Sequence, residues 1–474
     1  MCIFQKTSLP GTEVIHSHIA SPNFCIVVMA LAALAHILCL ELPVYILFAL
    51  TAIYICLFDQ DLLGLMPVMV ACYITPSATN NPGRNPQSVF SGGEGAVLGV
   101  LAVCMALALL FRIIRDRKQF FQKPGKCFLG LVTLCAAYFL SGIGSAAYPQ
   151  YLKNNLLFAL MQSACLFLPY WLFSRGVDWK NTQRDYFAWM CFAAGGVLAM
   201  EIFWSYCTQN VIFDGVIIRE RMFTGWGMYN NMGFLLAFML PSAFYLASKY
   251  RRGWLGTVVG SMYLICIFLT CSRSSIIGGC VIYAVCVVIM LRYAKNKKHN
   301  FIAWAVVCAL VMILLIAFHR QIFRLFSRLI AKGADPSSRD SIYVEGLRLF
   351  AQSPLFGVSF FSPGFQAWDF STLESFSALI PPRWHNTVVQ LLASCGCVGL
   401  VAYVLHRVQS VRMLLSRRHK EQIFIGCSVL VMIFCSLLDC HFFNLGPTLL
   451  YSAALAWAEF VPGKQTVSSL GNQG

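Results

Sequence analysis

Fourteen apolar stretches occupy most of this chain, and few charged residues interrupt them. A helix needs roughly 20 apolar residues to cross the ~30 Å hydrocarbon core of a bilayer, and most of these stretches come close to that length. They lie at residues 24–40, 42–58, 62–76, 96–114, 127–145, 155–174, 186–207, 231–248, 255–271, 276–292, 301–318, 386–405, 423–439 and 446–461. The stretches 42–58, 62–76 and 446–461 are short, so we expect 12–14 spans.

The composition also points to a membrane protein. Of the 474 residues, 58% are hydrophobic and 11% are charged, whereas a soluble domain carries roughly 25% charged residues. Backbone groups in lipid must be hydrogen-bonded within the chain, which leaves helical bundles and closed barrels. Unbroken apolar runs lack the alternation of a barrel strand. We therefore predict an all-α, polytopic transmembrane helical bundle, with residues 1–474 forming one membrane domain.

Lysine and arginine gather in five short connections between the apolar stretches. They are Arg115, Arg117, Lys118, Lys123 and Lys126; Arg175, Lys180 and Arg184; Lys249, Arg251 and Arg252; Arg292, Lys295, Lys297 and Lys298; and Arg407, Arg412, Arg417, Arg418 and Lys420. With 14 spans all five lie on one side, which the positive-inside rule makes cytoplasmic, together with both termini. The net charge of +16 reflects this bias rather than nucleic-acid binding.

One long connection, residues 319–385, is predicted to lie outside the cell, and its length makes it a candidate functional element. Basic residues recur at every fourth position near its start: Arg320, Arg324, Arg328 and Lys332. The opposite face is apolar, which predicts a basic amphipathic helix over 320–332 at the membrane surface. A second helix is expected to begin at Ser337 or Ser338 and to stop before a turn at 354–357.

Motifs of metal enzymes and nucleotide-binding enzymes are absent from the sequence. Most of the 21 cysteines lie in apolar stretches, where they act as small hydrophobic residues, so we expect neither a disulfide nor a metal site. Asp59-Gln60-Asp61 has the form with which nucleotide-sugar transferases hold a metal. Because it stands in a short connection between spans, we expect a solvated turn. No cofactor and no cleavable signal peptide are expected.

Arginines gather on the predicted outer side. Arg219 and Arg221 precede one span, together with Gly225, Asn230 and Asn231, and Arg273 stands between two spans. An arginine at membrane depth costs a few kcal/mol, so it usually has an anionic partner. The acids in nearby apolar segments are Glu201 and Asp439, which are fewer than the arginines.

An anionic ligand is the natural complement of these arginines. The planar guanidinium binds two phosphate oxygens at once. Arg219, Arg221, Arg273 and Arg339 therefore predict a phosphate site. For Arg273 alone, a side chain that reaches from the interface to water is an equally good interpretation.

His385 ends the long outer connection and stands at the start of the next span. Imidazole titrates near neutral pH, so this histidine is a candidate general base. Asn386 beside it could orient a partner, or both residues could serve only as a helix cap. His441, beside Asp439, is a weaker candidate base.

The order of these residues resembles the O-antigen ligase and O-antigen polymerase (Wzy-type) superfamily of bacterial membrane glycosyltransferases. The resemblance covers roughly residues 215–405. It is carried by Arg219/Arg221, Asn230-Asn231, Ser272-Arg273, Ser338-Arg339, Ser353-Pro354-Leu355-Phe356-Gly357-Val358, His385-Asn386 and a span ending near Gly399. Ser359 departs from the family pattern, which often has a second glycine after Gly357.

The resemblance implies a metal-independent, inverting glycosyltransferase that builds cell-surface polysaccharide on the outer face of the cytoplasmic membrane. Its donor would be an oligosaccharide on a polyprenyl (undecaprenyl) diphosphate, and its acceptor a glycan or lipid. His385 maps as the catalytic base, with Arg273 and Arg339 as catalytic diphosphate contacts. Arg219, Arg221 and Asn386 map as further donor contacts.

Several alternatives remain open on the sequence. Ligases and polymerases share the same site residues, so the sequence does not separate them. A membrane transporter or flippase for lipid-linked oligosaccharide is the main alternative, and a non-catalytic assembly partner is another. We also take the basic helix 320–332 as a hypothetical lid or headgroup guide for the donor.

Overall fold

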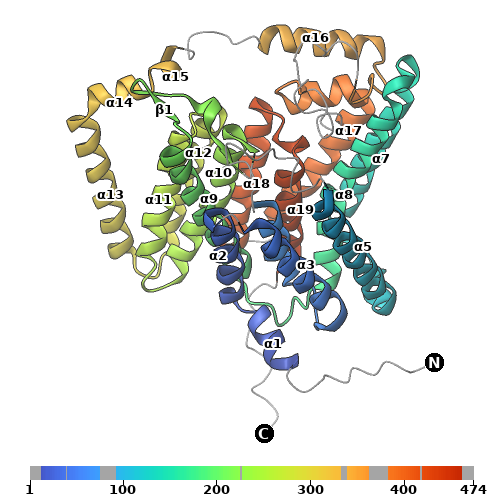
Figure 1. Ribbon diagram of the computed structural model, residues 1–474, viewed down its shortest axis with the longest axis horizontal. Helices are drawn as coiled ribbons and strands as arrows, with labels where there is room; N and C mark the ends of the chain where they lie inside the picture. The colour runs from blue at the N-terminus through green and yellow to red at the C-terminus, as the bar shows by residue number, and fades with distance from the viewer. Residues whose placement is uncertain are drawn as a thin grey trace.

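The computed structural model describes residues 12–38, 40–74, 92–224, 227–331, 339–361, 383–416 and 419–461. Long helices form a bundle, and short helices and two small hairpins gather at one end of it (Figure 1). Several residues named above fall outside these ranges: Gly225, Lys332, Ser337, Ser338, Arg417 and Arg418.

The helices and strands follow one another along the chain as follows. The N-terminal group is α1 (Thr12–Ile19), α2 (Pro22–Leu38), α3 (Glu41–Phe58), α4 (Leu65–Ile74), α5 (Gly92–Arg115) and α6 (Arg117–Phe120). Next come α7 (Phe128–Gly144), α8 (Leu152–Gly176), α9 (Tyr186–Thr208), β1 (Ile212–Phe213), β2 (Val216–Ile217), β3 (Phe223–Thr224) and β4 (Gly227–Met228). Then follow α10 (Tyr229–Lys249), α11 (Trp254–Leu269), α12 (Arg273–Tyr293), α13 (Lys297–Ala317), α14 (His319–Leu325), α15 (Ser327–Ala331) and α16 (Arg339–Gln352). The last elements are α17 (Thr387–Ser416), α18 (Lys420–Leu438), the single turn His441–Phe443 and α19 (Leu445–Phe460).

Each of the fourteen apolar stretches coincides with a helix, which confirms the all-α fold class. Among the described residues, nine helices are long and apolar enough to cross a membrane. Helices α2, α7 and α11 are apolar but have only 16 or 17 residues. Helix α4 has ten residues, which rise only about 15 Å, so it does not cross by itself.

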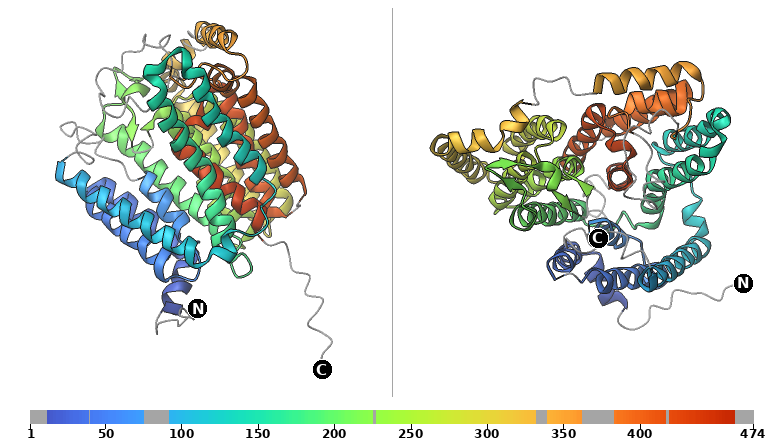
Figure 2. Two further views of the ribbon diagram at one scale, coloured as in Figure 1. Left: turned by 90° about the vertical axis from the view of Figure 1, so that its right-hand side faces the viewer. Right: turned by 45° about the horizontal axis from the view of Figure 1, so that its top comes forward.

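Helices α10 and α13 mark the centre and the edge of the bundle. In the most apolar 18-residue segment of α10, 94% of the residues are buried inside the protein, whereas the value for α13 is 6%. Helix α10 packs against α9, α11, α12 and α18, and α13 lies at the periphery (Figure 2). A helix that is apolar on all sides belongs in a protein core or in lipid, and these two helices show both cases.

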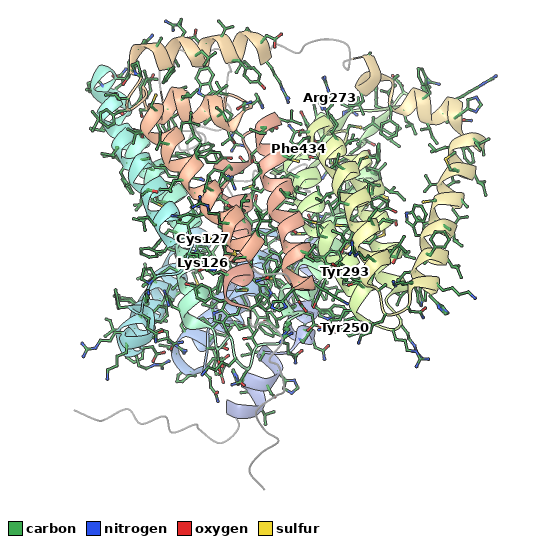
Figure 3. All side chains as sticks on the ribbon, turned by 180° about the vertical axis from the view of Figure 1, so that it is seen from behind. Lys126, Cys127, Tyr250, Arg273, Tyr293 and Phe434 are labelled. Carbon is green, nitrogen blue, oxygen red and sulfur yellow. The ribbon has the colours of Figure 1, made fainter. Side chains whose placement is uncertain are left out.

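All five basic connections meet at one end of the bundle, which we call the basic end. Four contacts link them: Arg175 with Lys123, Lys126 with Ser416, Lys249 with Asp185, and Lys420 with Tyr293. Figure 3 shows Tyr250 toward this end and Arg273 toward the other. The prediction that these connections share one side agrees with the structure.

Two predictions about charged residues at this side are wrong. Arg407 lies inside α17 and is 9% exposed, rather than in a loop. Asp59 and Asp61 form a turn, but each is only 5% exposed, rather than solvated. The guanidinium of Arg112 donates to the carbonyl of Asp59 at 2.5 Å, and Leu63 donates its N–H to the Asp61 carboxylate at 2.9 Å. These contacts hold the turn inside the protein.

Helix α17 is broken at Gly396, where φ is 63° and ψ is −159°. The break leaves backbone groups without helical partners, and the segment 354–359 supplies them. Val358 and Ser359 donate to the carbonyls of Ala393 and Ser394, and Cys397 and Val398 donate to the carbonyls of Pro354 and Leu355. The predicted turn at Pro354–Gly357 is therefore confirmed, and it is built into the break.

Close backbone contact explains the glycines at this crossing. Gly357 has φ of 69°, and a Cβ on it would lie 2.3 Å from the carbonyl carbon of Ser394. Ser359, the departure from the family pattern, has φ of 84°. Glycine reaches this left-handed region without the steric cost of a side chain, so a second glycine in relatives suits this backbone.

The described part of the long outer connection contains three short helices rather than two. The predicted helix 320–332 is wrong as a single element, because α14 ends at Leu325 and α15 begins at Ser327. Arg324 donates to the carbonyl of Asp214 at 3.0 Å, which ties α14 to the β1–β2 hairpin. The second predicted helix is confirmed as α16.

Candidate active site

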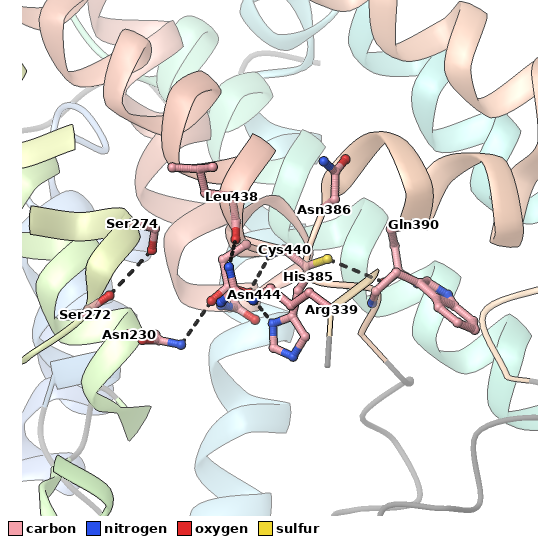
Figure 4. Close-up of polar contacts among 12 residues, drawn as sticks. Asn230, Ser272, Ser274, Arg339, His385, Asn386, Gln390, Leu438, Cys440 and Asn444 are labelled. Atoms are coloured by element: carbon pink, nitrogen blue, oxygen red, sulfur yellow. Dashed lines mark hydrogen bonds and ion pairs between the residues drawn. The ribbon is translucent and has the colours of Figure 1, made fainter. Parts of the chain in front are cut away.

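His385 and Asp439 form a hydrogen-bonded pair at the end of the bundle opposite the basic end. Figure 4 shows His385 close to Arg339 and Cys440. His385 precedes α17 and Asp439 follows α18, and Nδ1 of the imidazole lies 3.0 Å from Oδ1 of the carboxylate. An ionised carboxylate can only accept, so Nδ1 carries the hydrogen and Nε2 keeps its lone pair. The His385 side chain is 29% exposed, and Nε2 can therefore take a proton from a bound molecule.

Asp439 is surrounded by donors that keep it ionised. Burial alone would raise the pKa of Asp439, but the hydrogen bond from His385 and the nearby imidazoles outweigh it, so the pKa lies below its ordinary value. Asn230 donates to Oδ2 at 3.0 Å, and the backbone N–H of Cys440 donates to Oδ1 at 2.8 Å. With both oxygens engaged, the carboxylate has one orientation, and it sets that of the imidazole.

The backbone of His385 is held in a conformation that non-glycine residues avoid. Its φ is 49°, and a residue in this region costs on the order of 1–3 kcal/mol. The hydroxyl of Tyr343, from α16, donates to the His385 carbonyl at 3.3 Å. Strain of this kind persists only where surrounding contacts fix it, so it marks a residue whose direction matters.

Asn386 caps helix α17. Its Oδ1 accepts the backbone N–H groups of Val388 and Val389 at 2.8 and 3.2 Å, and its Nδ2 donates to the carbonyl of Leu437 at 2.8 Å. The interpretation of Asn386 as a helix cap is therefore confirmed. Its role as a diphosphate contact stays a prediction.

Arg339, the first residue of α16, lies beside the His385–Asp439 pair. Its Nη1 donates to the carbonyl of Leu438 at 3.0 Å, one residue before Asp439. Helix α16 thus brings a cation next to the candidate base. It also brings Tyr343, whose contact with the His385 backbone the sequence did not indicate.

Arg219 and Arg273 line a second part of the site, a small recess that is open on one side. Its other lining residues are Ile217, Glu220, Cys271, Leu325 and Leu329. Arg219 donates to the carbonyl of Cys271 at 3.0 Å, and its guanidinium lies 4.5 Å from the ring centroid of Tyr229. The recess therefore combines two guanidinium groups with an apolar wall from α14 and α15.

The start of α10 joins the recess to the His385–Asp439 pair. Tyr229 contacts Arg219, and the next residue, Asn230, donates to Asp439. Ser275 of α12 donates to the carbonyl of Asn230 at 3.4 Å. The two halves of the candidate site are thus held by adjacent residues of one buried helix.

Arg221 and His441 are not placed like the other predicted site residues. Arg221 donates to the carbonyl of Asn210 at 3.1 Å and lies 4.7 Å from the ring of Phe213, on the β1–β2 hairpin. His441 is 1% exposed and stacks on Phe234 at 4.4 Å. Burial lowers the pKa of His441 to about 4, and so little exposure leaves it out of reach of an acceptor.

Two residues near His385 were missed or undervalued on the sequence. Asp439 was noted as an acid, but its pairing with His385 joins residues 54 positions apart. Arg383 was not noted, although it stands two residues before His385 and lies close enough to His441 to influence its charge. The sequence feature that could have indicated Arg383 is its position just before the apolar stretch 386–405, which His385 also precedes.

Part of the chain is similar to a known protein family. Residues 258–404 match the family model described as O-antigen ligase. This match supports the resemblance of the chain to the O-antigen ligase and polymerase superfamily. The match contains Arg273, Arg339, His385 and Asn386, and it ends before Asp439. No curated protein matches the chain.

The match supports a general role for the chain. Its apolar helices and the O-antigen ligase domain support a multi-pass membrane protein of polysaccharide biosynthesis, and the matched family suggests glycosyltransferase-like activity. The family implies lipid-linked glycan substrates. The region outside 258–404 completes the site, since Arg219, Asn230 and Asp439 all lie there.

Proposed function

We propose that this protein transfers a glycan from a polyprenyl-diphosphate-linked donor to a hydroxyl of a glycan or lipid acceptor, on the outer face of the cytoplasmic membrane. The main support for the proposal is that one candidate base lies next to one recess lined by arginines. The His385–Asp439 pair and the Arg219–Arg273 recess adjoin the same residues, Tyr229 and Asn230.

In the reaction, the acceptor hydroxyl attacks the anomeric carbon of the donor sugar, and its proton passes to Nε2 of His385. The new bond forms as the bond between the anomeric carbon and the diphosphate oxygen breaks. The electron pair leaves with the polyprenyl diphosphate. Asp439 stabilises the imidazolium that forms, as a carboxylate does for a histidine it orients. A single displacement of this kind inverts the anomeric centre.

Arg219, Arg273 and Arg339 supply the cations for the leaving group. The diphosphate gains negative charge as the bond breaks, and preorganised guanidinium groups stabilise that charge. The proposal therefore needs no metal and no cofactor. Arg221 remains a weaker candidate for a donor contact, because its side chain lies with Asn210 and Phe213 rather than in the recess. Asn386 is also a weaker candidate, because its side chain caps α17.

The apolar wall of the recess suits a lipid-linked donor. Leu325 and Leu329 come from α14 and α15, the helices that replace the predicted lid. We propose that they cover the first isoprenoid units while the arginines hold the diphosphate. Arg324 anchors this cover to Asp214, so Arg324→Glu should raise the donor KM and leave kcat nearly unchanged.

The proposed orientation follows from the basic end. Positive loops favour the cytoplasmic side, which puts the candidate site outside. Single cysteines at Asn210 and Ser416, in a chain without other cysteines, test this with a membrane-impermeant maleimide on intact cells. Labelling of Asn210→Cys alone is expected, and labelling of Ser416→Cys alone would reverse the orientation.

The direct test is a transfer assay on purified protein in nanodiscs, with a polyprenyl-diphosphate oligosaccharide, an acceptor and excess EDTA. Free polyprenyl diphosphate and product size are measured together. His385→Ala should lower kcat by about 10²- to 10⁴-fold, the usual contribution of a general base. A ladder of products identifies a polymerase, and a single transfer identifies a ligase.

His299→Ala is the matched control, because His299 is exposed at the N-terminal end of α13, away from the site. It should transfer like wild type. A wild-type protein that leaves the donor intact, or a His385→Ala variant as active as wild type, would refute the proposal. Movement of intact donor between leaflets would then favour a flippase.

A further inference from the structure

Arg407 is a buried cation inside the bundle that the proposed reaction does not use. It lies roughly 16 Å along α17 from the break at Gly396, and it is 9% exposed. No carboxylate pairs with it among the residues that the structure describes. Burying a charge in a membrane protein costs free energy, so an arginine retained there usually has a function.

Aromatic rings take the place of a carboxylate around Arg407. Its guanidinium carbon lies 4.6 Å from the ring centroid of Tyr403, 4.5 Å from that of Phe442 and 5.0 Å from that of Tyr451. Its Nη1 donates to the hydroxyl of Tyr451 at 2.8 Å. The face of an aromatic ring attracts a cation, and it does so more strongly when both are removed from water.

Phe442 connects this cluster to the candidate active site. It stands three residues after Asp439, in the single turn between α18 and α19. Its ring lies against Arg407, and its carbonyl accepts hydrogen bonds from Gln162 at 2.7 Å and Thr448 at 2.8 Å. Contacts therefore fix the connection 439–444 at two places. Phe442 is held by Arg407, Gln162 and Thr448, and Asp439 is held by its hydrogen bonds with His385 and Asn230.

We infer that Arg407 is a positioning residue for the His385–Asp439 pair and acts through the ring of Phe442. The guanidinium holds the ring, the ring holds the connection 439–444, and this connection sets the place of the Asp439 carboxylate. A displaced carboxylate would misdirect the imidazole without touching the arginines of the recess. The inference rests on the proposed function of His385 as the base.

The first test measures kinetics of Arg407→Met, which keeps much of the volume and removes the charge. We expect kcat to fall by about ten- to a hundredfold, as on loss of a group that orients a catalytic ligand, with the donor KM unchanged. Arg407→Lys should recover part of kcat, because lysine keeps the charge but not the flat face. Arg412→Met, an exposed arginine of the same helix, is the control and should match wild type.

A double variant separates positioning from a general loss of structure. If Arg407 acts through Asp439, adding Arg407→Met to Asp439→Asn should lower kcat little further, because contacts in one network are not additive. Effects that multiply fully, or a raised donor KM with unchanged kcat, would overturn the inference.

Hydrogen–deuterium exchange gives a readout that does not depend on the reaction. Uptake in residues 439–444 should rise in Arg407→Met and stay unchanged in Arg412→Met, in protein that elutes as a single folded species. Unchanged uptake in Arg407→Met would overturn the inference. If wild type transfers no glycan, the proposed function fails, and the exchange result still decides whether Arg407 holds this connection.

Discussion

The two ends of the bundle use positive charge in different ways. At the basic end, lysines and arginines are spread over five connections. Arg175 and Lys420 bind backbone carbonyls, Lys249 pairs with Asp185, and Arg251 lies exposed. At the opposite end, Arg219 and Arg273 share one recess and Arg339 lies beside a histidine–carboxylate pair. The charges that we expect to set topology are dispersed, whereas those of the proposed site converge.

A count of cations therefore does not identify a site. The basic end has more lysines and arginines than the site end, yet what distinguishes the latter is a base oriented by Asp439 next to a recess with an apolar wall. Substitutions at the two ends should therefore have very different effects on transfer.

The largest loss outside the base itself is expected at Arg273. Arg273→Ala should lower kcat by about 10²- to 10³-fold, the cost of losing one preorganised group that stabilises developing charge. Arg273→Lys should recover only part of this, because an ammonium group cannot bind two phosphate oxygens as a planar fork does. Steady-state release of polyprenyl diphosphate measures both, and near-normal activity of Arg273→Ala would remove it from the site.

A smaller loss is expected for Asp439→Asn, about ten- to a hundredfold in kcat, because the carboxamide no longer fixes the His385 tautomer. The variant should also change the pH dependence of stability. Because folding lowers the pKa of Asp439, its stabilisation is complete above the unfolded pKa of about 4 and is lost as the pH falls below it.

Thermal melts between pH 7 and pH 3 test the second part of this prediction. The melting temperature of the wild type should fall more steeply below pH 4 than that of Asp439→Asn. Parallel curves would mean that the native environment does not favour the ionised carboxyl, and the pairing with His385 would lose its support.

Arg221→Ala should reduce kcat/KM by less than about fivefold, because an exposed charge acting at a distance contributes under ~1 kcal/mol. Its side chain lies on the β1–β2 hairpin with Asn210 and Phe213. Arg219→Ala, measured beside it, should behave like Arg273→Ala. If Arg221→Ala lowered kcat/KM as much as Arg219→Ala, the hairpin would have to turn Arg221 toward the donor during the reaction.

No change in kcat or donor KM is expected for Arg251→Gln at the basic end. Arg251 is exposed and lies on the opposite side of the membrane from the proposed site. A clear kinetic effect in correctly inserted protein would break the contrast between the two ends. The same preparations must be checked for orientation by cysteine labelling.

The sequence indicated the helices well because hydropathy is a local property. Each apolar stretch became a helix, and His385 and Arg273 were predicted as site residues from their places next to apolar stretches. The pairing of His385 with Asp439 was not foreseen, because it depends on how α17 and α18 pack. The break in α17 was hidden for the same reason, since its partners lie in the segment 354–359.

Arg407 shows how a local rule can mislead. An arginine near the end of an apolar run is normally expected to begin a loop, and Arg407 was predicted to lie in one for this reason. The rings of Phe442 and Tyr451, which surround its charge, come from later parts of the chain. Only the packed structure brings them together, so the burial of this cation could not be read from its neighbours in sequence.

The break in α17 has a consequence for how the protein is made. The carbonyls of Ala393 and Ser394 and the amides of Cys397 and Val398 take their partners from the segment 354–359. Bare peptide groups in hydrocarbon cost several kcal/mol each, so α17 is not an independent unit of membrane insertion. The ribosome delivers the segment 354–359 before α17, and α17 can settle only after that earlier segment has been placed against it.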